Sequence, residues 1–329
     1  MLARRMLPRI LQMAAPLGFP GLRHARADIR GDIVFGRDGY LFAAWEDVRR
    51  LNPQRMRLVL QLVAQVAQIM RDAGIQMAVP LIPTKARILA DMLPPDFQPA
   101  PDVQRRYEDS MQELRRAGAI VPDCAAVLAR LRTSQPEAVF FKADSHWTAT
   151  GAEAAAQDMA RAIQAAVQLP PSRHPGVRLG NAITVTHSGD LVALLPEPER
   201  PRFPPERFRV RPAVAASRRA GLLDEDGADI AVIGNSYMQP DYFGYPHVLS
   251  AALNRPVALA WKTARVGPYR VLLDYVTGSQ FRAQRPKVLL WQLMEGSLEQ
   301  MPDAGNWWEP ASAIPTNQFL NDLRRAVAR

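Results

Sequence analysis

Two short segments of this sequence carry the side chains needed for acyl transfer through a serine. The first is the Asp-Ser-His segment at 144–146, and the second is the Gly-Asn-Ser segment at 234–236. A carboxylate two residues before a histidine can orient one imidazole nitrogen, and a serine on a tight turn after a buried strand is a usual hydroxyl nucleophile. Asp144, His146 and Ser236 would form a Ser–His–Asp triad if the fold brings the two segments together.

The first segment is also consistent with two other roles. Asp144 or Thr148 could begin a helix as its N-cap, with His146 hydrogen-bonded to the backbone. A metal site is the second alternative, in which His187 and Asp190 would join the segment as ligands. The spacings for such a site are loose, and no thiolate contributes to it.

Ser236 is also a candidate for two other roles, as an oxyanion donor and as a helix N-cap. Acyl transfer needs hydrogen-bond donors for the charge that develops on the carbonyl oxygen, and the amide of Ser236 is the first candidate. Gly234 before it allows the sharp backbone turn that would point the hydroxyl out of a sheet. Ser236 is equally consistent with a helix N-cap, a common role of serine at such positions.

The elements around these segments alternate between strands and helices, which predicts an α/β fold with a parallel sheet. Apolar runs bounded by turn residues predict strands at 32–35, 40–42, 75–82, 119–121, 138–141, 229–233, 256–261 and 287–294. Helical periodicity predicts helices at 53–74, 102–118 with Asp102 as its cap, 124–132, 149–167, 268–281 and 317–328. Both chemical segments then follow strands, and open α/β sheets bind ligands at the carboxyl ends of strands.

Composition is that of a globular protein with one interruption in its pattern. The chain has 329 residues, of which 48% are hydrophobic and 22% charged, so a sizeable core is expected. From Pro170 to about Asp226 prolines are dense and helical periodicity is lost, and 183–185 offers only a short β-like run. We therefore predict a proline-rich, partly β insertion at about 170–226.

The formal net charge of +9 raises the question of a polyanionic partner. Nucleic acid is disfavoured, because no stretch interleaves basic residues with aromatics and prolines break the arginine-rich piece 200–211. A basic surface suits acidic polysaccharides or anionic lipids equally well. The single cysteine, Cys124, excludes a disulfide within the chain.

The N-terminal region has the features of an export signal. Arginines precede an apolar stretch at 10–22, and the Ala-Arg-Ala sequence at 25–27 fits a small-x-small cleavage site. Arg4 and Arg5 fit a twin-arginine core, although two prolines weaken the apolar segment. The alternatives are a basic tail and an uncleaved segment that anchors the protein to the inner membrane. We expect a signal or anchor at 1–27 and a single domain at 28–329.

Four motifs occur in a familiar order along the chain: Asp-Gly-Tyr-Leu-Phe at 38–42, Val79-Pro80 through Pro-Thr-Lys at 83–85, Asp-Ser-His-Trp-Thr at 144–148 followed by Gly151, and Gly-Asn-Ser-Tyr at 234–237. Together they resemble the alginate O-acetyltransferase family, whose domain is SGNH-hydrolase-like, over most of residues 31–300. The resemblance implies a parallel sheet with flanking helices and a periplasmic enzyme that moves acetyl groups onto, or off, an exopolysaccharide. Asp144, His146 and Ser236 match the triad of that family.

The same resemblance implies further site residues. Gly267 stands where a second oxyanion donor is expected, although a loop glycine before a helix is an equal alternative. Gln292 stands where SGNH enzymes usually carry an asparagine, and its amide could point away from the site. Lys85, Tyr237 and Trp147 are candidates for sugar contacts, against the alternatives of a solvated surface lysine and of aromatic core packing.

The implied activity needs a polysaccharide substrate and, because acetyl-coenzyme A is absent outside the cytoplasm, a membrane-bound protein that donates the acetyl group. No cofactor or metal is implied. Two alternatives to the transferase remain: a carbohydrate acetylesterase that uses the same triad with water as acceptor, and a catalytically silent polysaccharide-binding or assembly protein. Departures from the family pattern near Gln292 motivate the second alternative.

Overall fold

The computed structural model describes residues 29–30, 32–135, 137–214 and 228–328, and the export signal predicted at 1–27 lies outside these residues. At the centre is a four-stranded parallel sheet in the order β11-β10-β12-β4. Its strands are β4 (Gln76–Ala78), β10 (Ile230–Gly234), β11 (Val257–Trp261) and β12 (Val288–Trp291). The predicted α/β fold with a parallel sheet is therefore confirmed.

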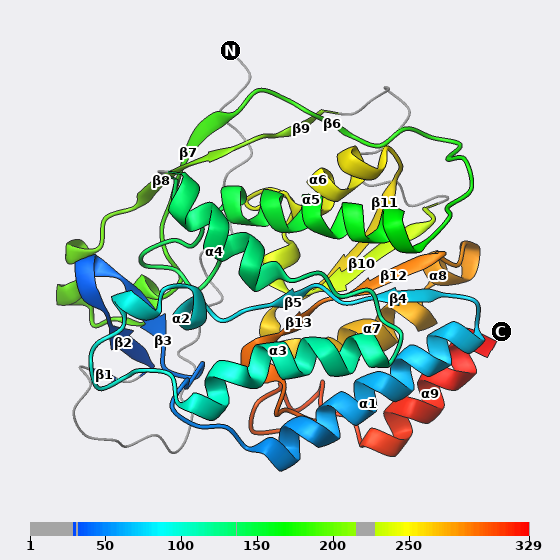
Figure 1. Cartoon of the computed structure of the whole chain (residues 1–329), viewed down its shortest axis with the longest axis horizontal. Coiled ribbons are helices and arrows are strands. Elements are labelled where there is room, and N and C mark those ends of the chain that lie inside the picture. Colours follow the sequence, from blue (N-terminus) through cyan, green and yellow to red (C-terminus); the bar gives the residue numbers. More distant parts are fainter. Residues whose placement is uncertain (1–28, 31, 136, 215–227, 329) are drawn as a thin grey trace.

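Helices cover both faces of this sheet (Figure 1). One core joins alternate residues of β10, such as Ile230 and Val232, to α4 (Cys124–Ser134), α5 (Ala149–Ala166) and α6 (Tyr245–Leu253). A second core joins the intervening residues to the helices α1 (Pro53–Asp72), α3 (Pro101–Arg116), α7 (Pro268–Thr277), α8 (Ser279–Ala283) and α9 (Thr316–Ala328). A strand buried on both faces explains why β10 reads as a continuous apolar run.

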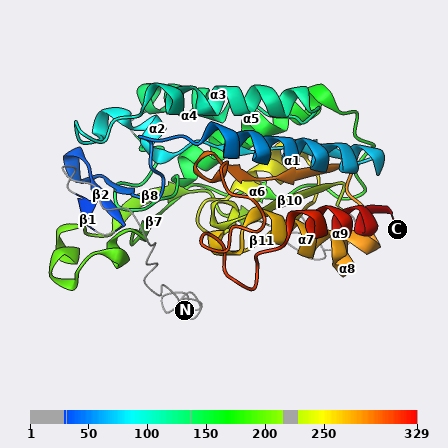
Figure 2. The same ribbon diagram turned by 90° about the horizontal axis from the view of Figure 1, so that it is seen from below.

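Helices α1 and α9 lie side by side in Figures 1 and 2, so the C-terminal helix packs against the first long helix of the chain. The N-cap of α1 is Asn52, whose side chain accepts a hydrogen bond from the Arg55 amide, and Pro53 occupies the first turn as predicted. In the part of the chain that the structure describes, no helix combines the length and apolar character needed to cross a membrane.

Two long strands predicted from the sequence are each divided. The 75–82 run forms β4 and then β5 (Leu81–Ile82), because Pro80 has no N–H with which to continue the ladder. The 287–294 run likewise forms β12 and then β13 (Leu293–Met294), which pairs with β5 in a separate two-stranded sheet. The main sheet therefore ends at Trp291, directly before Gln292.

Other local predictions were wrong in instructive ways. Residues 119–121 and 138–141 form only isolated bridges, Ala78 with Ile120 and Phe140 with Trp147, so neither is a strand. The 144–146 segment therefore reaches the sheet edge on a loop. Asp102 does not cap α3, which begins at Pro101 after Ala100, since the fixed φ of proline suits the first helical turn.

The predicted hairpin near the start of the chain is confirmed. Strands β2 (Ile33–Phe35) and β3 (Leu41–Ala43) pair antiparallel, and β1 (Ile29–Arg30) extends the sheet. The short helix η1 (Arg37–Gly39) joins β2 and β3.

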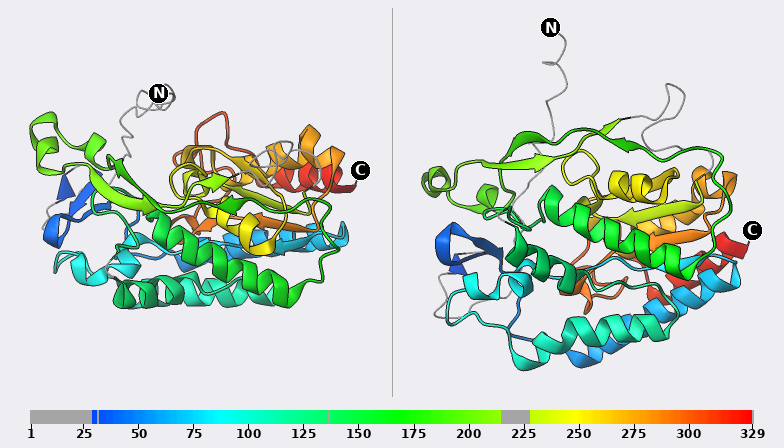
Figure 3. Two further views of the ribbon diagram at one scale, coloured as in Figure 1. Left: turned by 90° about the horizontal axis from the view of Figure 1, so that it is seen from above. Right: turned by 45° about the horizontal axis from the view of Figure 1, so that its top comes forward.

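The insertion contains two short antiparallel ladders. One pairs β7 (Ile183–His187) with β8 (Glu206–Val210), and the other pairs β6 (Arg178–Leu179) with β9 (Ala213–Val214). The β7–β8 ladder lies on the outer side of α5 (Figure 3). A small third core, made by Ile33, Leu41, Ala43, Ala143, Leu191 and Leu195, joins the insertion to the β2–β3 hairpin. The insertion is thus packed against the segment that carries Asp144.

Candidate active site

Ser236 lies on the turn that follows β10, at the carboxyl end of a central strand. Its Oγ is 2.7 Å from Nε2 of His146. Asn235, not Ser236, is the N-cap of the short helix η5 (Ser236–Met238), because its side chain accepts a hydrogen bond from the Tyr237 amide. The capping alternative for Ser236 was therefore wrong, and its hydroxyl faces an imidazole.

Gly234 is required by the close packing of this turn. A β-carbon at this position would lie 2.7 Å from the Oε1 atom of Gln292 and 2.7 Å from the side chain of Met238. Because Gly234 has no side chain, its backbone can lie directly against Gln292. This contact sets the positions of Asn235 and Ser236 beyond the end of the strand.

The Asp144 carboxylate is buried and holds His146 from the other side of the ring. Oδ1 of Asp144 accepts hydrogen bonds from the backbone N–H of His146 and from its Nδ1, both at 2.7 Å. Oδ2 is 2.7 Å from Nε2 of His187 and accepts the backbone N–H of Asp190 at 2.8 Å. Both carboxylate oxygens are thus fully engaged, and Nε2 of His146 is directed at the serine.

The electrostatics of this pair suit a general base. Burial alone would raise the pKa of Asp144, but its contacts with His146 and His187 hold that pKa well below the ordinary value. Burial lowers the pKa of His146, and the charge and hydrogen bond of Asp144 outweigh this effect, so the net pKa is raised. The carboxylate therefore stabilises the imidazolium that forms when His146 accepts a proton.

Helix capping accounts for Thr148 but not for the rest of the segment. Thr148 is the N-cap of α5, since its Oγ1 accepts the Gly151 amide at 3.3 Å. Asp144 caps no helix here, and the ring nitrogens of His146 contact side chains instead of backbone. The capping alternative was right for Thr148 alone.

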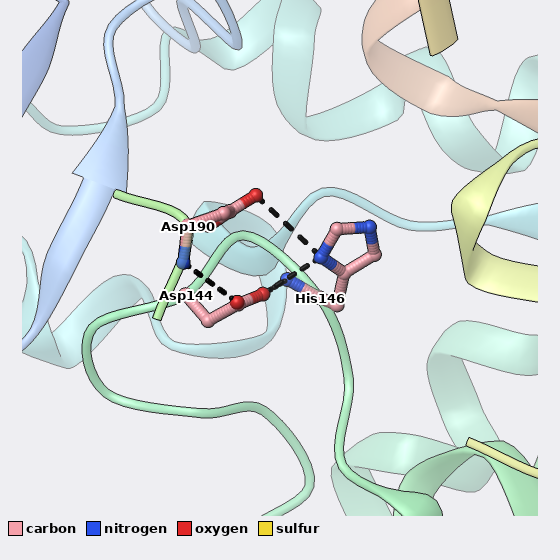
Figure 4. Close-up of side chains that lie close together, drawn as sticks. All are labelled: Asp144, His146 and Asp190. Carbon is pink, nitrogen blue, oxygen red and sulfur yellow. Dashed lines mark hydrogen bonds and ion pairs between the residues drawn. The ribbon is translucent and has the colours of Figure 1, made fainter. Parts of the chain in front are cut away.

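The four residues considered as metal ligands do lie together. Asp144, His146 and Asp190 lie close together in Figure 4. Their ligand atoms are all within 4.8 Å of one another. Each is engaged by a neighbour: the Asp190 carboxylate accepts hydrogen bonds from the amide and hydroxyl of Ser145, and its Oδ2 is 3.6 Å from Nδ1 of His146. His187 contributes its Nε2 to Asp144. The hydrogen bonds favour a proton-transfer network over a metal site.

Lys85 corrects both interpretations considered for it. It is 1% exposed, so it is neither a surface lysine nor positioned to bind a sugar. Its Nζ donates to the carbonyl oxygens of Leu41, Lys142 and Asp144 at 2.6, 2.8 and 2.9 Å. Burial lowers its pKa to about 8, so the ammonium still predominates at neutral pH. Lys85 ties the Asp144 loop to strand β3.

Tyr237 and Trp147 are both buried among aromatic neighbours. Tyr237 is 4% exposed, and its hydroxyl donates to the Ser145 carbonyl at 2.6 Å. Trp147 is fully buried and stacks on Tyr245 with ring centroids 5.6 Å apart. These contacts agree with core packing for Trp147, whereas Tyr237 also borders the cavity beside Ser236, so its contact with a sugar stays a prediction.

His146 and Ser236 border a cavity of about 690 Å³. Its walls come from the hairpin, the insertion and the loops after β10, β11 and β12. Lining residues include Trp45, Glu46, His146, Asp190, Ser236, Arg265, Gly267, Gln292, Trp307 and Glu309. A cavity of this size holds far more than an acetyl group.

The oxyanion candidates differ in what they can offer. Gly267 borders the cavity with φ of 76°, but its N–H donates to the Ala264 carbonyl at 3.1 Å, so this amide is already used. It precedes Pro268 at the start of α7, which agrees with the loop-glycine alternative. Gln292 does not point away: its Oε1 accepts the Asn235 amide at 2.9 Å, and its buried Nε2 has no partner among the described residues.

Sequence reasoning gave His187 and Asp190 no role except as metal ligands, and it did not single out Glu46. The first two lie in the insertion, whose path cannot be read from periodicity. Glu46 follows β3 and borders the cavity through a turn that carries no motif. Each reaches the site through tertiary packing alone.

Comparison with known proteins finds similarity over most of the chain. Residues 33–295 match the family described as the SGNH hydrolase-like domain of the acetyltransferase AlgX. A Pseudomonas aeruginosa protein named "Probable alginate O-acetylase AlgJ" is 28% identical over 291 residues, which are 83% of this chain and 72% of that protein. Its Pseudomonas fluorescens namesake is 28% identical over 306 residues, 89% and 76% of the two chains.

A solved structure shares the fold. The O-acetyltransferase domain of Pseudomonas putida AlgJ superposes with a TM-score of 0.71 and 26% identity, and the match covers 90% of this chain and all of that domain. The Pseudomonas aeruginosa AlgX structure has a TM-score of 0.60 at 18% identity, covering 83% of this chain and 67% of that one, and this likeness shows the fold alone.

Proposed function

The chain belongs to the family of SGNH hydrolase-like domains of the acetyltransferase AlgX, and from this membership we propose that it is an exported O-acetyltransferase that acetylates hydroxyl groups of an exopolysaccharide. The relatives named alginate O-acetylase support both the reaction and the class of acceptor. Export is supported by the arginines and apolar stretch of the first 27 residues.

The observation that carries the proposed mechanism is the alignment of three side chains. Nε2 of His146 is 2.7 Å from Oγ of Ser236, while Nδ1 is 2.7 Å from Oδ1 of Asp144. In the first half-reaction Ser236 Oγ attacks the carbonyl carbon of the donor ester, and Nε2 of His146 takes its proton. The ester bond to the donor breaks, and the same proton passes to the departing oxygen.

The second half-reaction reverses these roles. A hydroxyl of the acceptor sugar attacks the acetyl carbon of the acetyl-enzyme, and Nε2 of His146 takes the proton of that hydroxyl. The bond between the acetyl carbon and Ser236 Oγ breaks, and the proton returns to Oγ. Asp144 stays ionised throughout, in keeping with its lowered pKa, and stabilises the imidazolium in both halves.

Two donors are proposed for the charge on the acetyl oxygen. One is the amide of Ser236, which lies on the same turn as its hydroxyl. The other is Nε2 of Gln292, a buried donor without a partner among the described residues, in a side chain that borders the same cavity. Leaving such a donor unpaired costs free energy, and a ligand oxygen would recover it.

We also propose that residues 28–329 form one catalytic domain, with the insertion at about 170–226 as part of it. The third hydrophobic core and the His187–Asp144 contact support this, because both join the insertion to the rest of the site. We propose a membrane-bound acetyl-donor protein as partner. Acetyl-coenzyme A is absent outside the cytoplasm, so another molecule must bring the acetyl group to an exported enzyme.

Turnover of an aryl acetate tests the proposal. Wild-type protein is expected to release the aryl alcohol and to gain the mass of one acetyl group, whereas Ser236→Ala, with an unchanged circular dichroism spectrum and melting temperature, does neither. Adding an oligosaccharide then identifies the acceptor: acetylated sugar indicates a transferase, and free acetate alone indicates an esterase. If wild type and Ser236→Ala are equally inert while both bind oligosaccharide, the protein is a binding protein and the proposal fails.

A further inference from the structure

Glu46 is an acidic residue of the cavity that the proposed triad does not use. It follows strand β3 and is 9% exposed, and it borders the same cavity as Ser236 and His146. Among the described residues its carboxyl group has neither a hydrogen-bond partner nor an ion-pair partner. A carboxyl group that borders a cavity and has no partner among the described residues can form hydrogen bonds with a ligand in that cavity.

The part of the cavity wall against which Glu46 packs is held by ion pairs and a hydrogen bond. Gly296 lies against its side chain, so that a β-carbon on this glycine would lie 3.6 Å from Cγ of Glu46. The preceding residue, Glu295, is buried and fixed by Arg87 at 2.6 Å, by Arg106 at 3.1 Å and by the amide of Thr84 at 3.0 Å. The surface that contacts the Glu46 side chain is therefore rigid, which limits the movement of its carboxyl group.

The charged groups around Glu46 act in opposite directions. Burial raises its pKa most, and Glu295 and Asp190 raise it further, while Lys85 and Arg106 lower it, giving a value of about 7. His146 and Tyr237 also face it, and the charge of Glu46 contributes to raising the pKa of both. Near neutral pH much of Glu46 is therefore a carboxylic acid, which can both donate and accept a hydrogen bond.

The chemistry of this group matches a sugar. A carboxylic acid that donates and accepts suits ring hydroxyl groups, which do the same. Trp45, the preceding residue, borders the cavity as well and adds an aromatic surface beside the carboxyl. The acetyl group has one carbonyl oxygen, and the Ser236 amide and Gln292 are already proposed as its hydrogen-bond donors. Glu46 is therefore available to bind the acceptor sugar.

We propose that Glu46 binds a ring hydroxyl of the acceptor sugar and holds the neighbouring hydroxyl for deprotonation by His146. This inference rests on the proposed acetyltransferase function. Glu46 thereby acts in the second half-reaction, and acetyl-enzyme formation from a small donor does not depend on it. The acceptor is a hydroxyl-bearing sugar that enters the cavity beyond Ser236.

The ratio of transfer to hydrolysis tests the inference. With an aryl acetate as donor and an alginate oligosaccharide as acceptor, acetylated sugar and free acetate arise from the same acetyl-enzyme. Their ratio therefore does not depend on how fast the acetyl-enzyme forms. Glu46→Ala is expected to lower that ratio about tenfold, as loss of one buried hydrogen bond to substrate predicts, with the aryl-alcohol burst unchanged. Glu46→Gln keeps a donor and an acceptor and should stay within about threefold of wild type.

The pH dependence gives a second measurement that does not require Glu46→Ala to fold. In wild type the ratio is expected to fall as pH rises through about 7, because ionised Glu46 loses its proton donor, whereas in Glu46→Gln it should be flat. Glu113→Gln, a 53% exposed carboxyl on α3, is the matched control.

Three outcomes would overturn the inference. A folded Glu46→Ala protein with an unchanged ratio and unchanged acceptor KM would show that Glu46 does not bind the acceptor. Loss of the aryl-alcohol burst in that variant would assign Glu46 to the donor half instead. A pH-independent ratio in wild type would exclude the acid form as the donor. Failure of the proposed function is distinct, since wild type itself would then form no acetyl-enzyme.

Discussion

His187 and His146 share one carboxylate: Nε2 of His187 lies 2.7 Å from Oδ2 of Asp144, and Nδ1 of His146 lies 2.7 Å from Oδ1. His146 is the one that contacts Ser236. His187 therefore helps to fix the carboxylate that orients His146. It lies in the insertion, which is remote in sequence from both motifs.

His187→Ala is expected to lower kcat for aryl acetate about tenfold with little change in KM, because Asp144 loses a hydrogen bond that orients it without any loss of substrate contact. His187→Gln retains a donor and should recover most of the activity. The measurement is steady-state kinetics of both variants beside wild type. Equal kcat in wild type and a folded His187→Ala protein would contradict the positioning role.

The pH–rate profile should report the raised pKa of His146. A general base works only when it is unprotonated, so kcat/KM for aryl acetate should rise with pH, with its midpoint above the ordinary histidine value of 6.5. In Asp144→Asn the largest of the charges that raise this pKa is gone while burial still lowers it, so residual activity should show a lower midpoint. A midpoint that stays in place in Asp144→Asn would contradict the pairing.

Glu46→Gln should stabilise the protein in a pH-dependent way. The folded pKa of about 7 lies above the unfolded value of 4.5, so as pH rises the unfolded chain loses the proton first, and wild-type stability falls between these values. The variant has no such loss. Its free energy of unfolding should equal that of wild type near pH 4 and exceed it at pH 8 by on the order of 2 to 3 kcal/mol.

Urea unfolding at the two pH values measures this difference. The exposed Glu113→Gln variant, whose carboxyl is 53% exposed, provides the baseline. A gap of the same size at both pH values would show that burial of Glu46 does not perturb its ionisation.

Lys85→Met should reduce both stability and activity. The substitution removes the ammonium donor from three carbonyl oxygens, of which that of Lys142 keeps the Leu41 amide, so it costs about 2 kcal/mol or more, and it frees the loop that carries Asp144. Lys142→Met, at an exposed lysine of the same loop, is the control and should stay close to wild type. Thermal melting and aryl acetate turnover check this, and a Lys85→Met protein as active as the control would exclude the anchoring role.

Chelation distinguishes the hydrogen-bonded network from a metal site. If Asp144, His146 and Asp190 are held by one another, then dialysis against EDTA should leave aryl acetate turnover and the melting temperature unchanged. Wild-type protein dialysed against buffer alone is the control. Activity that disappears with EDTA and returns with zinc would establish these residues as ligands instead.

The parts of the fold that sequence predicted well are those where the local pattern and the tertiary environment agree. Helix α1 has a proline at its start and a continuous apolar face, and strand β10 is apolar throughout because both of its faces are buried. The hairpin at 33–43 was predictable because its turn residues can adopt positive φ: 54° at Asp38 and 80° at Gly39.

The predictions failed where tertiary contacts decide the structure. The apolar run at 138–141 reads as a strand, yet only Phe140 makes a bridge, because the chain there turns back upon Trp147. Lys85 looked like an exposed or substrate-binding charge, since no local pattern signals that three distant carbonyls converge on one ammonium. For the same reason His187 could not be connected with Asp144 before the path of the insertion was known.

The ammonium of Lys85 also has a consequence for how the protein folds. It bonds backbone from β3 and from the loop around Asp144, while His187 contacts Asp144 from the insertion. Segments far apart in sequence must therefore all be docked before Asp144, His146 and Ser236 are aligned. Such long-range closure is slow compared with the formation of local helices. A compact intermediate with its helices in place would therefore still lack the contacts that align Asp144, His146 and Ser236, and we expect these contacts to form late in folding.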